Sequence, residues 1–369
     1  MSAFTEFVLV AIALYLWEST LWLPLRGVVL RRRWRGKSWK ILDPRSYMAG
    51  KDLGVVPMLP FPTDSRIAPC QAPPLVATAD GGFLMEIASG PLVLIKSLEW
   101  NDLSEKDHYL TASGIRTRTT SPRQVDLLRR SKNRGFGVET AVTRAWRLAL
   151  SPARAEREWR KWKMVAGPLS LYGPVLALGF FGGLPLAYIH LGIMPMLILL
   201  VWLWLLMVWT AAHLWWLGKR AYPAARGSLK MDALLSLFVP FHAMRAYEIA
   251  SVHAMATTHP VGLILSTGDT ENPWLGTFVR HILHPLPGSP ENAAFARAVK
   301  PLLSAALATR GKQLSDYDTV PDNTEDPETT GYCPRCQARY LPDVTVCSDC
   351  KDMPLSPFSL SASASNDPR

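Results

Sequence analysis

The chain has 369 residues, of which 49% are hydrophobic and 19% are charged, and Lys and Arg outnumber Asp and Glu by 40 to 30. A mean hydropathy of +0.08 is wrong for a fully disordered chain and too polar for a protein made mostly of membrane helices. No Gly triplet or sustained heptad is visible, which excludes collagen-like and coiled-coil classes. We therefore expect a membrane protein, mainly α-helical, that combines apolar spans with soluble parts.

Three segments are long and apolar enough to span a hydrocarbon core of about 30 Å as helices. The first, within residues 1–25, runs from Phe4 to Leu25 without Lys or Arg. It lacks the basic leading region of a signal peptide, so we expect a retained anchor. The other two, Val165 to Leu191 and Ile193 to Leu217, are expected to form a transmembrane hairpin over residues 165–217. For each segment, a buried core helix is the alternative.

Basic residues stand beside these spans on one side only. They follow the first span, precede the second and follow the third, whereas no Lys or Arg precedes the first span or separates the second from the third. The positive-inside rule then places the N-terminus outside and the C-terminus in the cytoplasm of a multi-pass protein of the cytoplasmic (inner) membrane. The cations that we assign to topology or to lipid headgroups are Arg31, Arg32, Arg33, Arg35, Lys37, Arg157, Arg160, Lys161 and Lys163.

The middle segment is the most basic part of the chain. Residues 26–163 contain 26 Lys and Arg against 13 Asp and Glu, a net charge of +13 that exceeds the +10 of the whole protein. Such a surplus attracts nucleic acid or anionic lipid. Its position beside the spans, with Trp34, Trp39, Trp159 and Trp162 interleaved, favours membrane lipids as the partner and argues against nucleic acid. The alternative is that these charges only set the topology.

The middle segment divides into three regions. Residues 26–81 are basic and then Pro-rich without periodicity, which indicates a cytoplasmic linker. Residues 82–135 contain short apolar runs separated by turns, followed by a helix that begins at Ser121-Pro122. This order resembles part of a pleckstrin-homology-type barrel, and the resemblance implies lipid or protein binding without chemistry. Residues 136–164 are typical of two basic juxtamembrane helices that break at Ser151-Pro152.

Residues 218–311 are expected to form a cytoplasmic helical region. Within it, Ala233 to Phe241 is apolar but too short to span, which favours a re-entrant, interfacial or packed segment. His242 and His253 would share one face of an uninterrupted helix, as a metal site or proton relay needs. No Asp, Glu or Cys completes a ligand set at helical spacing, so packing histidines are favoured. Glu18, a carboxylate within an apolar span, is the other functional candidate, with snorkelling or helix pairing as the alternative.

Four of the five cysteines lie in the segment YCPRCQARYLPDVTVCSDC. Cys333 and Cys336 form one CxxC pair, and Cys347 and Cys350 form a second after ten intervening residues. Each pair makes a tight turn that directs two thiolates at one ion, and the residues between them make a hairpin, which suits tetrahedral Zn²⁺. The motif resembles the short bacterial zinc ribbons written CPxC followed by CxxC. Four thiolates fill the coordination sphere, so we expect structural Zn²⁺; a dithiol redox centre is the alternative.

The rest of the C-terminal region is expected to be disordered around this zinc ribbon, residues 332–354. Residues 312–331 include six acidic residues and no cation between Asp316 and Glu328, as is typical of an acidic linker. Residues 355–369 are Ser-rich and are expected to be a disordered tail.

No catalytic motif stands out. The chain has no phosphate-cradling GxxxxGK[ST], no GxGxxG after a strand, no HExxH and no GxSxG. We therefore expect a non-enzymatic scaffold, assembly or regulatory protein whose ribbon mediates a protein-protein interaction. A membrane-embedded enzyme, or a subunit of a larger membrane complex that acts on lipid or protein, is the alternative.

Overall fold

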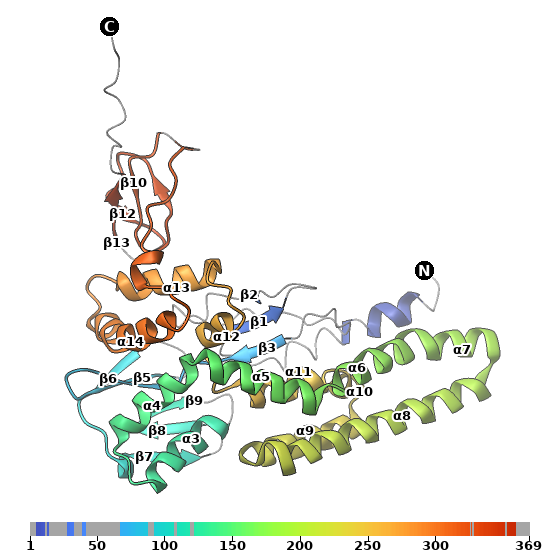
Figure 1. Ribbon diagram of the computed structural model, residues 1–369. Helices are drawn as coiled ribbons and strands as arrows, with labels where there is room; N and C mark the ends of the chain where they lie inside the picture. Colours follow the sequence, from blue (N-terminus) through green and yellow to red (C-terminus); the bar gives the residue numbers. More distant parts are fainter. Residues whose placement is uncertain are drawn as a thin grey trace.

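The computed structural model describes residues 5–11, 13–14, 28–32, 39–41, 67–87, 92–106, 109–118, 122–324, 326, 328–350 and 353–358. A body of short sheets and helices carries a long helical hairpin that projects to one side and a small β-module that stands on top (Figure 1). Four of the predicted site residues, Glu18, Arg33, Arg35 and Lys37, lie outside the described residues.

In the described part of the N-terminal region, short antiparallel strands form three sheets of three strands each. The first sheet has the order β2-β1-β3 and consists of β1 (Val28–Arg32), β2 (Trp39–Ile41) and β3 (Ile67–Cys70). The second consists of β4 (Leu75–Ala77), β5 (Phe83–Glu86) and β6 (Leu92–Ile95), and the third of β7 (Leu103–Lys106), β8 (Tyr109–Ala112) and β9 (Ile115–Arg118). A short 3-10 turn, η1 (Trp100–Asp102), joins the second sheet to the third.

These strands correct the predicted linker. The sequence predicts an irregular segment over residues 26–81, but β1 to β4 lie within it. The reason is that β1 pairs with β3 across a long stretch of chain, and local periodicity does not reveal such pairing. The five strands β5 to β9 precede helix α3 (Pro122–Asn133), as expected for the β-rich region of residues 82–135. Closure into a pleckstrin-homology-type barrel stays a prediction.

Two helices, α4 (Val138–Leu150) and α5 (Pro152–Ala166), correspond to the predicted pair of basic helices. Their break is where the sequence predicts it, because the Ser151 hydroxyl accepts a hydrogen bond from the Arg154 N–H at 3.4 Å and caps α5. The side chains of Trp159 and Trp162 are 7% and 0% exposed, so the expectation that they face lipid headgroups is wrong. They lie three residues apart on the inner face of α5 and pack into the core.

The projecting hairpin consists of two long apolar helices. The first contains α6 (Leu169–Leu178), the π-helical turn η2 (Gly179–Gly183) and α7 (Leu184–Leu191), and the second contains α8 (Ile193–Trp216) and the turn η3 (Leu217–Ala221). Both are long and apolar enough to cross a membrane, and only 17% of the most apolar window of each is buried, unlike in a core helix. They correspond to the second and third predicted spans. Of the first, the structure describes residues 5–11 and 13–14 in helical conformation, which does not establish a third span.

Short helices follow the hairpin, the first of them packed along it and the later ones within the body (Figure 1). These are η4 (Pro223–Ala225), α9 (Arg226–Phe238), α10 (Pro240–Met244), α11 (Ala246–Met255), α12 (Pro260–Ser266), α13 (Pro273–Leu283) and α14 (Pro290–Ala308). Asn272 and Ser289 cap α13 and α14, since their side chains accept hydrogen bonds from the N–H groups of Trp274 and Asn292.

The acidic linker is packed where it is described, contrary to the expected disorder. It contains the turn η5 (Leu314–Tyr317), and the Tyr317 hydroxyl donates to the Thr270 carbonyl at 2.9 Å. Asp318 lies 2.8 Å from Nε2 of His284. These partners come from the α13 region, which an acidic composition alone does not reveal. The ribbon that follows is built from β10 (Gly331–Tyr332), β11 (Arg339–Tyr340), β12 (Val346–Cys347), β13 (Met353–Pro354) and β14 (Ser356–Pro357).

Candidate metal centre

The four predicted zinc ligands come together in the ribbon. The Sγ atoms of Cys333, Cys336, Cys347 and Cys350 all lie within 4.8 Å of one another. The first pair sits on a tight turn, in which the Gln337 N–H donates to the Cys333 carbonyl at 2.8 Å and Gln337 itself has a φ of 62°. Cys347 is the last residue of β12. The first pair lies at the turn between β10 and β11 and the second at the turn between β12 and β13, so β11 and β12 pair with these neighbours and not with each other, contrary to the expected hairpin.

The donor set fits Zn²⁺. With zinc–sulfur bonds of about 2.3 Å, two thiolates of a tetrahedral site lie about 3.8 Å apart, and Sγ of Cys336 is 3.7 Å from Sγ of Cys347. All five cysteines are free thiols. Hydrogen bonds from the Cys336 and Cys350 thiols lower the pKa of Cys333, and the same bonds raise the pKa of Cys336 and Cys350. The thiols thus share their protons, which a bound metal would replace. When bound, the ion would be held by all four sulfurs, leaving no position for a substrate water.

A buried cation accompanies the four thiols. Arg335 is 5% exposed; burial lowers the pKa of its guanidinium, and the charges of the four cysteines act in the opposite direction. Because four thiolates and Zn²⁺ carry a net charge of −2, a neighbouring guanidinium offsets part of that charge. Leu286, just beyond α13, also packs against the cysteine cluster, so the ribbon is seated on the helical region.

The structure brings the two predicted histidines together through a residue that the sequence analysis missed. Nε2 of His242 lies 3.6 Å, and Nε2 of His253 lies 3.4 Å, from the carboxylate oxygens of Asp232. The histidines are on separate helices, α10 and α11, and Asp232 comes from α9. Among the described residues, the four cysteines are the one group of three or more His, Cys, Asp or Glu side chains placed to hold a metal ion. Asp232, His242 and His253 form a polar cluster in which both imidazoles are buried.

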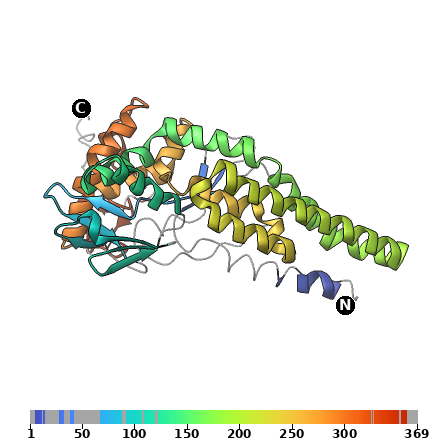
Figure 2. The same cartoon turned by 90° about the horizontal axis from the view of Figure 1, so that it is seen from below.

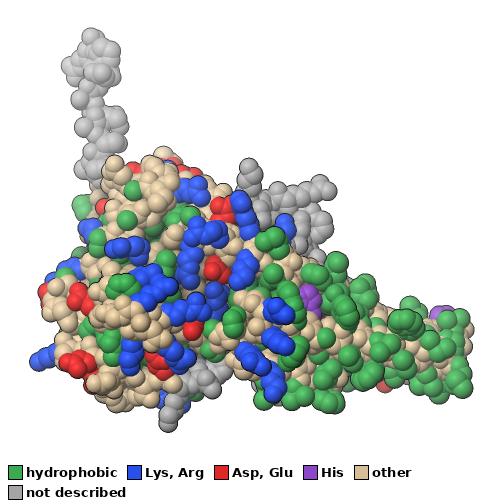
Figure 3. Space-filling view, turned by 60° about the horizontal axis from the view of Figure 1, so that its bottom comes forward, with side chains coloured by type: hydrophobic (Ala, Val, Ile, Leu, Met, Phe, Trp, Pro, Cys, Tyr) green, Lys and Arg blue, Asp and Glu red, His purple; other side chains and the backbone are tan. Residues whose placement is uncertain are grey.

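The described cations of the predicted headgroup set lie on two elements. Arg157, Arg160, Lys161 and Lys163 are exposed on α5, while Arg31 and Arg32 lie on β1. Figure 3 shows Lys and Arg side chains gathered on the body where it meets the apolar hairpin.

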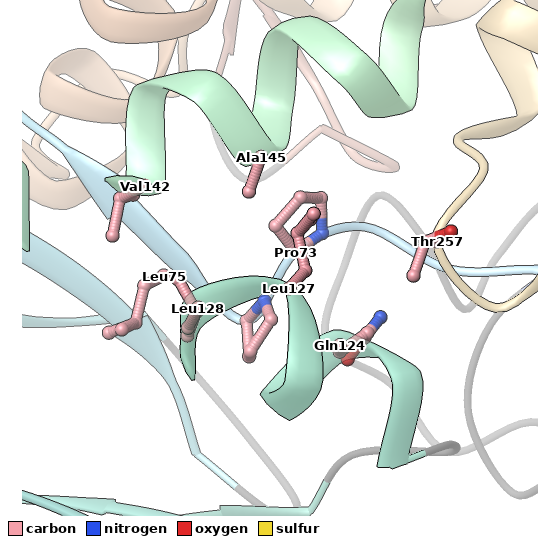
Figure 4. Close-up of a pocket in the computed structure, with 9 residues that line it drawn as sticks. Pro73, Leu75, Gln124, Leu127, Leu128, Val142, Ala145 and Thr257 are labelled. Atoms are coloured by element: carbon pink, nitrogen blue, oxygen red, sulfur yellow. The ribbon is translucent and has the colours of Figure 1, made fainter. Parts of the chain in front are cut away.

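Two further features, the Cys70 thiol and an apolar pocket, offer no reactive titratable group. Burial raises the pKa of the lone Cys70 thiol well above its usual range, so it stays protonated. The pocket between β4, α3 and α4 is lined by apolar side chains together with Gln124 and Thr257 (Figure 4). The Gln124 amide is engaged, since its Nε2 donates to the Ala256 carbonyl at 2.9 Å.

The chain matches no protein-family model, no curated protein and no solved structure.

Proposed function

We propose that the protein is a non-enzymatic scaffold, assembly or regulatory protein of the cytoplasmic membrane, in which the zinc ribbon recruits a protein partner. This proposal is based on the separation of the apolar hairpin from the four-cysteine site. The apolar hairpin is exposed at one end, and the closed four-cysteine site stands apart from it on the body (Figure 1). A closed site gives the ribbon a structural role, which suits a binding module better than a catalyst.

The ribbon offers a surface for such a partner. Leu341, Val344 and Val346 are 54%, 39% and 39% exposed, and they lie between the two CxxC pairs. Apolar side chains gathered on a small exposed module are typical of protein-binding sites.

In this proposal the membrane part has three spans, with the N-terminal segment as the first. The N-terminus lies outside and the ribbon in the cytoplasm, because the cations flank the hairpin on the side of the body. The exposed cations of α5 then face the anionic headgroups of the cytoplasmic leaflet.

The experiment isolates the intact chain and three variants from native membranes, identifies the proteins recovered with each and measures the bound zinc. Cys333→Ser/Cys336→Ser should lose both zinc and the partner. Leu341→Ser/Val344→Ser should keep zinc and lose the partner, while Cys70→Ala should keep both. If both ribbon variants retain the same partners as the intact chain, recruitment by the ribbon is refuted.

A second candidate is a membrane-embedded enzyme, or a subunit of a larger membrane complex that acts on lipid or protein. The buried cluster of Asp232, His242 and His253 favours it, because a carboxylate beside imidazoles is a common acid–base arrangement. In that case Asp232→Asn should abolish turnover of the substrate while the zinc content and the recovered partners stay unchanged.

A further inference from the structure

Helices α9 and α10 return along the apolar hairpin instead of leaving it. A Cβ on Gly218, in η3, would lie 3.4 Å from the Cα of Arg226, the first residue of α9, so α9 starts beside η3. Just beyond the far end of α9, the chain reaches the middle of the hairpin, where the rings of Phe241 and Phe181 stack with centroids 6.1 Å apart. Phe181 is near the midpoint of the helix Leu169–Leu191. Figures 1 and 2 both show α9 running beside α8 and ending about half-way along it.

The exposed side chains of α8 and α9 change character at the same level. At the end of the α8 span, exposed Trp215 and Trp216 give way to exposed Lys219 and Arg220 in η3. On α9, which runs in the opposite direction, the exposed cations come first. The exposed residues of α9 after its cations are Met231 (57%), Leu234 (50%) and Phe238 (76%). One polar–apolar boundary therefore crosses both helices, as a membrane surface would require.

The backbone of the turn between α9 and α10 is satisfied within the protein. The Val239 N–H donates to the Leu235 carbonyl at 2.8 Å, and the Val239 carbonyl accepts from His242 and Ala243 at 3.0 and 3.1 Å. Pro240 has no N–H to satisfy. Non-helical backbone at membrane depth is tolerated on this condition.

The polar side chain in the middle of α9 faces the protein. The Asp232 carboxylate lies against His242 and His253, and these imidazoles are buried between helices. The outward face from Met231 to Phe238 thus carries no exposed charge. Ionisable residues at membrane depth usually point toward the protein interior in this way.

From these observations we propose that α9 and α10 form a re-entrant hairpin. It enters the leaflet next to the body, reaches the middle of the bilayer at Phe238–Phe241 and returns. The side chains of Met231, Leu234 and Phe238 contact the acyl chains of that leaflet. This inference rests on the proposed membrane anchor, because it uses the α6–α8 hairpin as the spanning element.

The test places the photo-crosslinking residue p-benzoylphenylalanine in the full chain, reconstituted in phosphatidylcholine/phosphatidylglycerol nanodiscs. The substituted positions are Phe238 and Leu234 on α9, Val201 on α8 as the membrane control and Lys300 on α14 as the water-facing control. After irradiation, intact-protein mass spectrometry measures phospholipid adducts. Phe238 and Leu234 should match Val201 and exceed Lys300 by about tenfold, because the benzophenone inserts into neighbouring acyl C–H bonds.

Each outcome has a defined meaning. Adducts at Val201 without adducts at Phe238 and Leu234 overturn the re-entrant hairpin while leaving the anchor intact. Absence of adducts at Val201 as well refutes the anchor and the inference that rests on it. Gel filtration of each variant confirms assembly, and the two α9 positions guard against misfolding at either one.

Discussion

At the residue scale, the charge beside the metal centre leads to a prediction. Arg335 is buried against the four cysteines, whereas Arg339 pairs with Asp326 on the ribbon surface at 2.8 Å. Arg335→Gln should weaken zinc binding by about tenfold or more, the effect expected when a group that supports a metal site is removed. Arg339→Gln is the matched control and should bind zinc as the intact protein does. Competition with a chelating dye measures both, and equal affinity in the two variants would contradict the role of Arg335.

Glu248 leads to a pH prediction. Burial raises the pKa of this carboxyl from 4.5 to about 7, although Arg245 opposes the rise. A group whose pKa is higher in the folded state stabilises that state fully below its unfolded pKa and loses the effect as the pH rises through its folded pKa. The intact protein should therefore lose about 3 kcal/mol of stability between pH 4.5 and 7.5 through this residue.

The measurement is the unfolding temperature in detergent across that pH range. Glu248→Gln should show a flatter pH profile than the intact protein, with the two curves converging at low pH. Glu139, exposed on α4, is the control position, and Glu139→Gln should follow the intact protein. If the unfolding temperatures of all three proteins change with pH in parallel, Glu248 does not take up a proton on folding.

The metal ligands could be predicted from the sequence because their geometry is local. Two CxxC turns each direct two sulfurs inward whatever the rest of the fold does. The partner of His242 and His253 could not be predicted in this way. Asp232 lies on α9, whereas His242 and His253 lie on α10 and α11, and the chain turns between these helices. Spacing along one helix therefore does not predict the contact. The pairing follows from tertiary packing.

At the element scale, the helices were easier to predict than the strands. Ser151-Pro152, Asn272-Pro273 and Ser289-Pro290 mark helix starts because a capping side chain acts within three residues. The strands β1 and β3 pair over a long distance in the chain, and nothing local marks them. The outward role assigned to Trp159 and Trp162 was wrong because cations beside them on α5 occupy the other face of the helix.

The contact between α6 and α10 depends on Gly173. A Cβ at this position would overlap the carbonyl oxygen of Met244, which is backbone and cannot move aside. Gly173→Val should therefore push α10 away from α6 and lower the unfolding free energy by roughly 1–3 kcal/mol. A Cβ on Gly182, in η2, meets nothing within 4 Å, so Gly182→Ala is the control. Thermal unfolding in detergent distinguishes them, and equal melting temperatures would argue against close packing of α10.

At the scale of the whole molecule, the order of parts along the chain was predictable, but their contacts were not. Hydropathy locates the hairpin, and cysteine spacing locates the ribbon. Composition alone predicts a free acidic tether between ribbon and body. In the structure, Asp318 contacts His284 and Thr319 accepts a hydrogen bond from Gln337 of the ribbon at 2.8 Å. The ribbon is therefore held against α13, and a recruited partner would be held at a defined distance from the hairpin.

The basic surface beside the hairpin leads to a prediction about lipids. Arg160 and Lys163 are exposed on the last turns of α5, next to the start of α6. If they face anionic headgroups, each contributes about 1 kcal/mol, or roughly a fivefold change in affinity. Phosphatidylglycerol should then raise the melting temperature of the detergent-solubilised protein more than phosphatidylcholine does. Arg160→Gln/Lys163→Gln should reduce that difference, and added salt should reduce it in the intact protein.

The matched control removes the same charge from a surface away from the hairpin. Arg297 and Lys300 are exposed on α14, so Arg297→Gln/Lys300→Gln should leave the preference for phosphatidylglycerol unchanged. Equal loss in both double variants would indicate a general effect of net charge. Loss in neither would indicate that the cations of α5 set the orientation of the hairpin without binding lipid. A loss confined to the α5 variant would show that these cations recognise anionic headgroups as well as flanking a span.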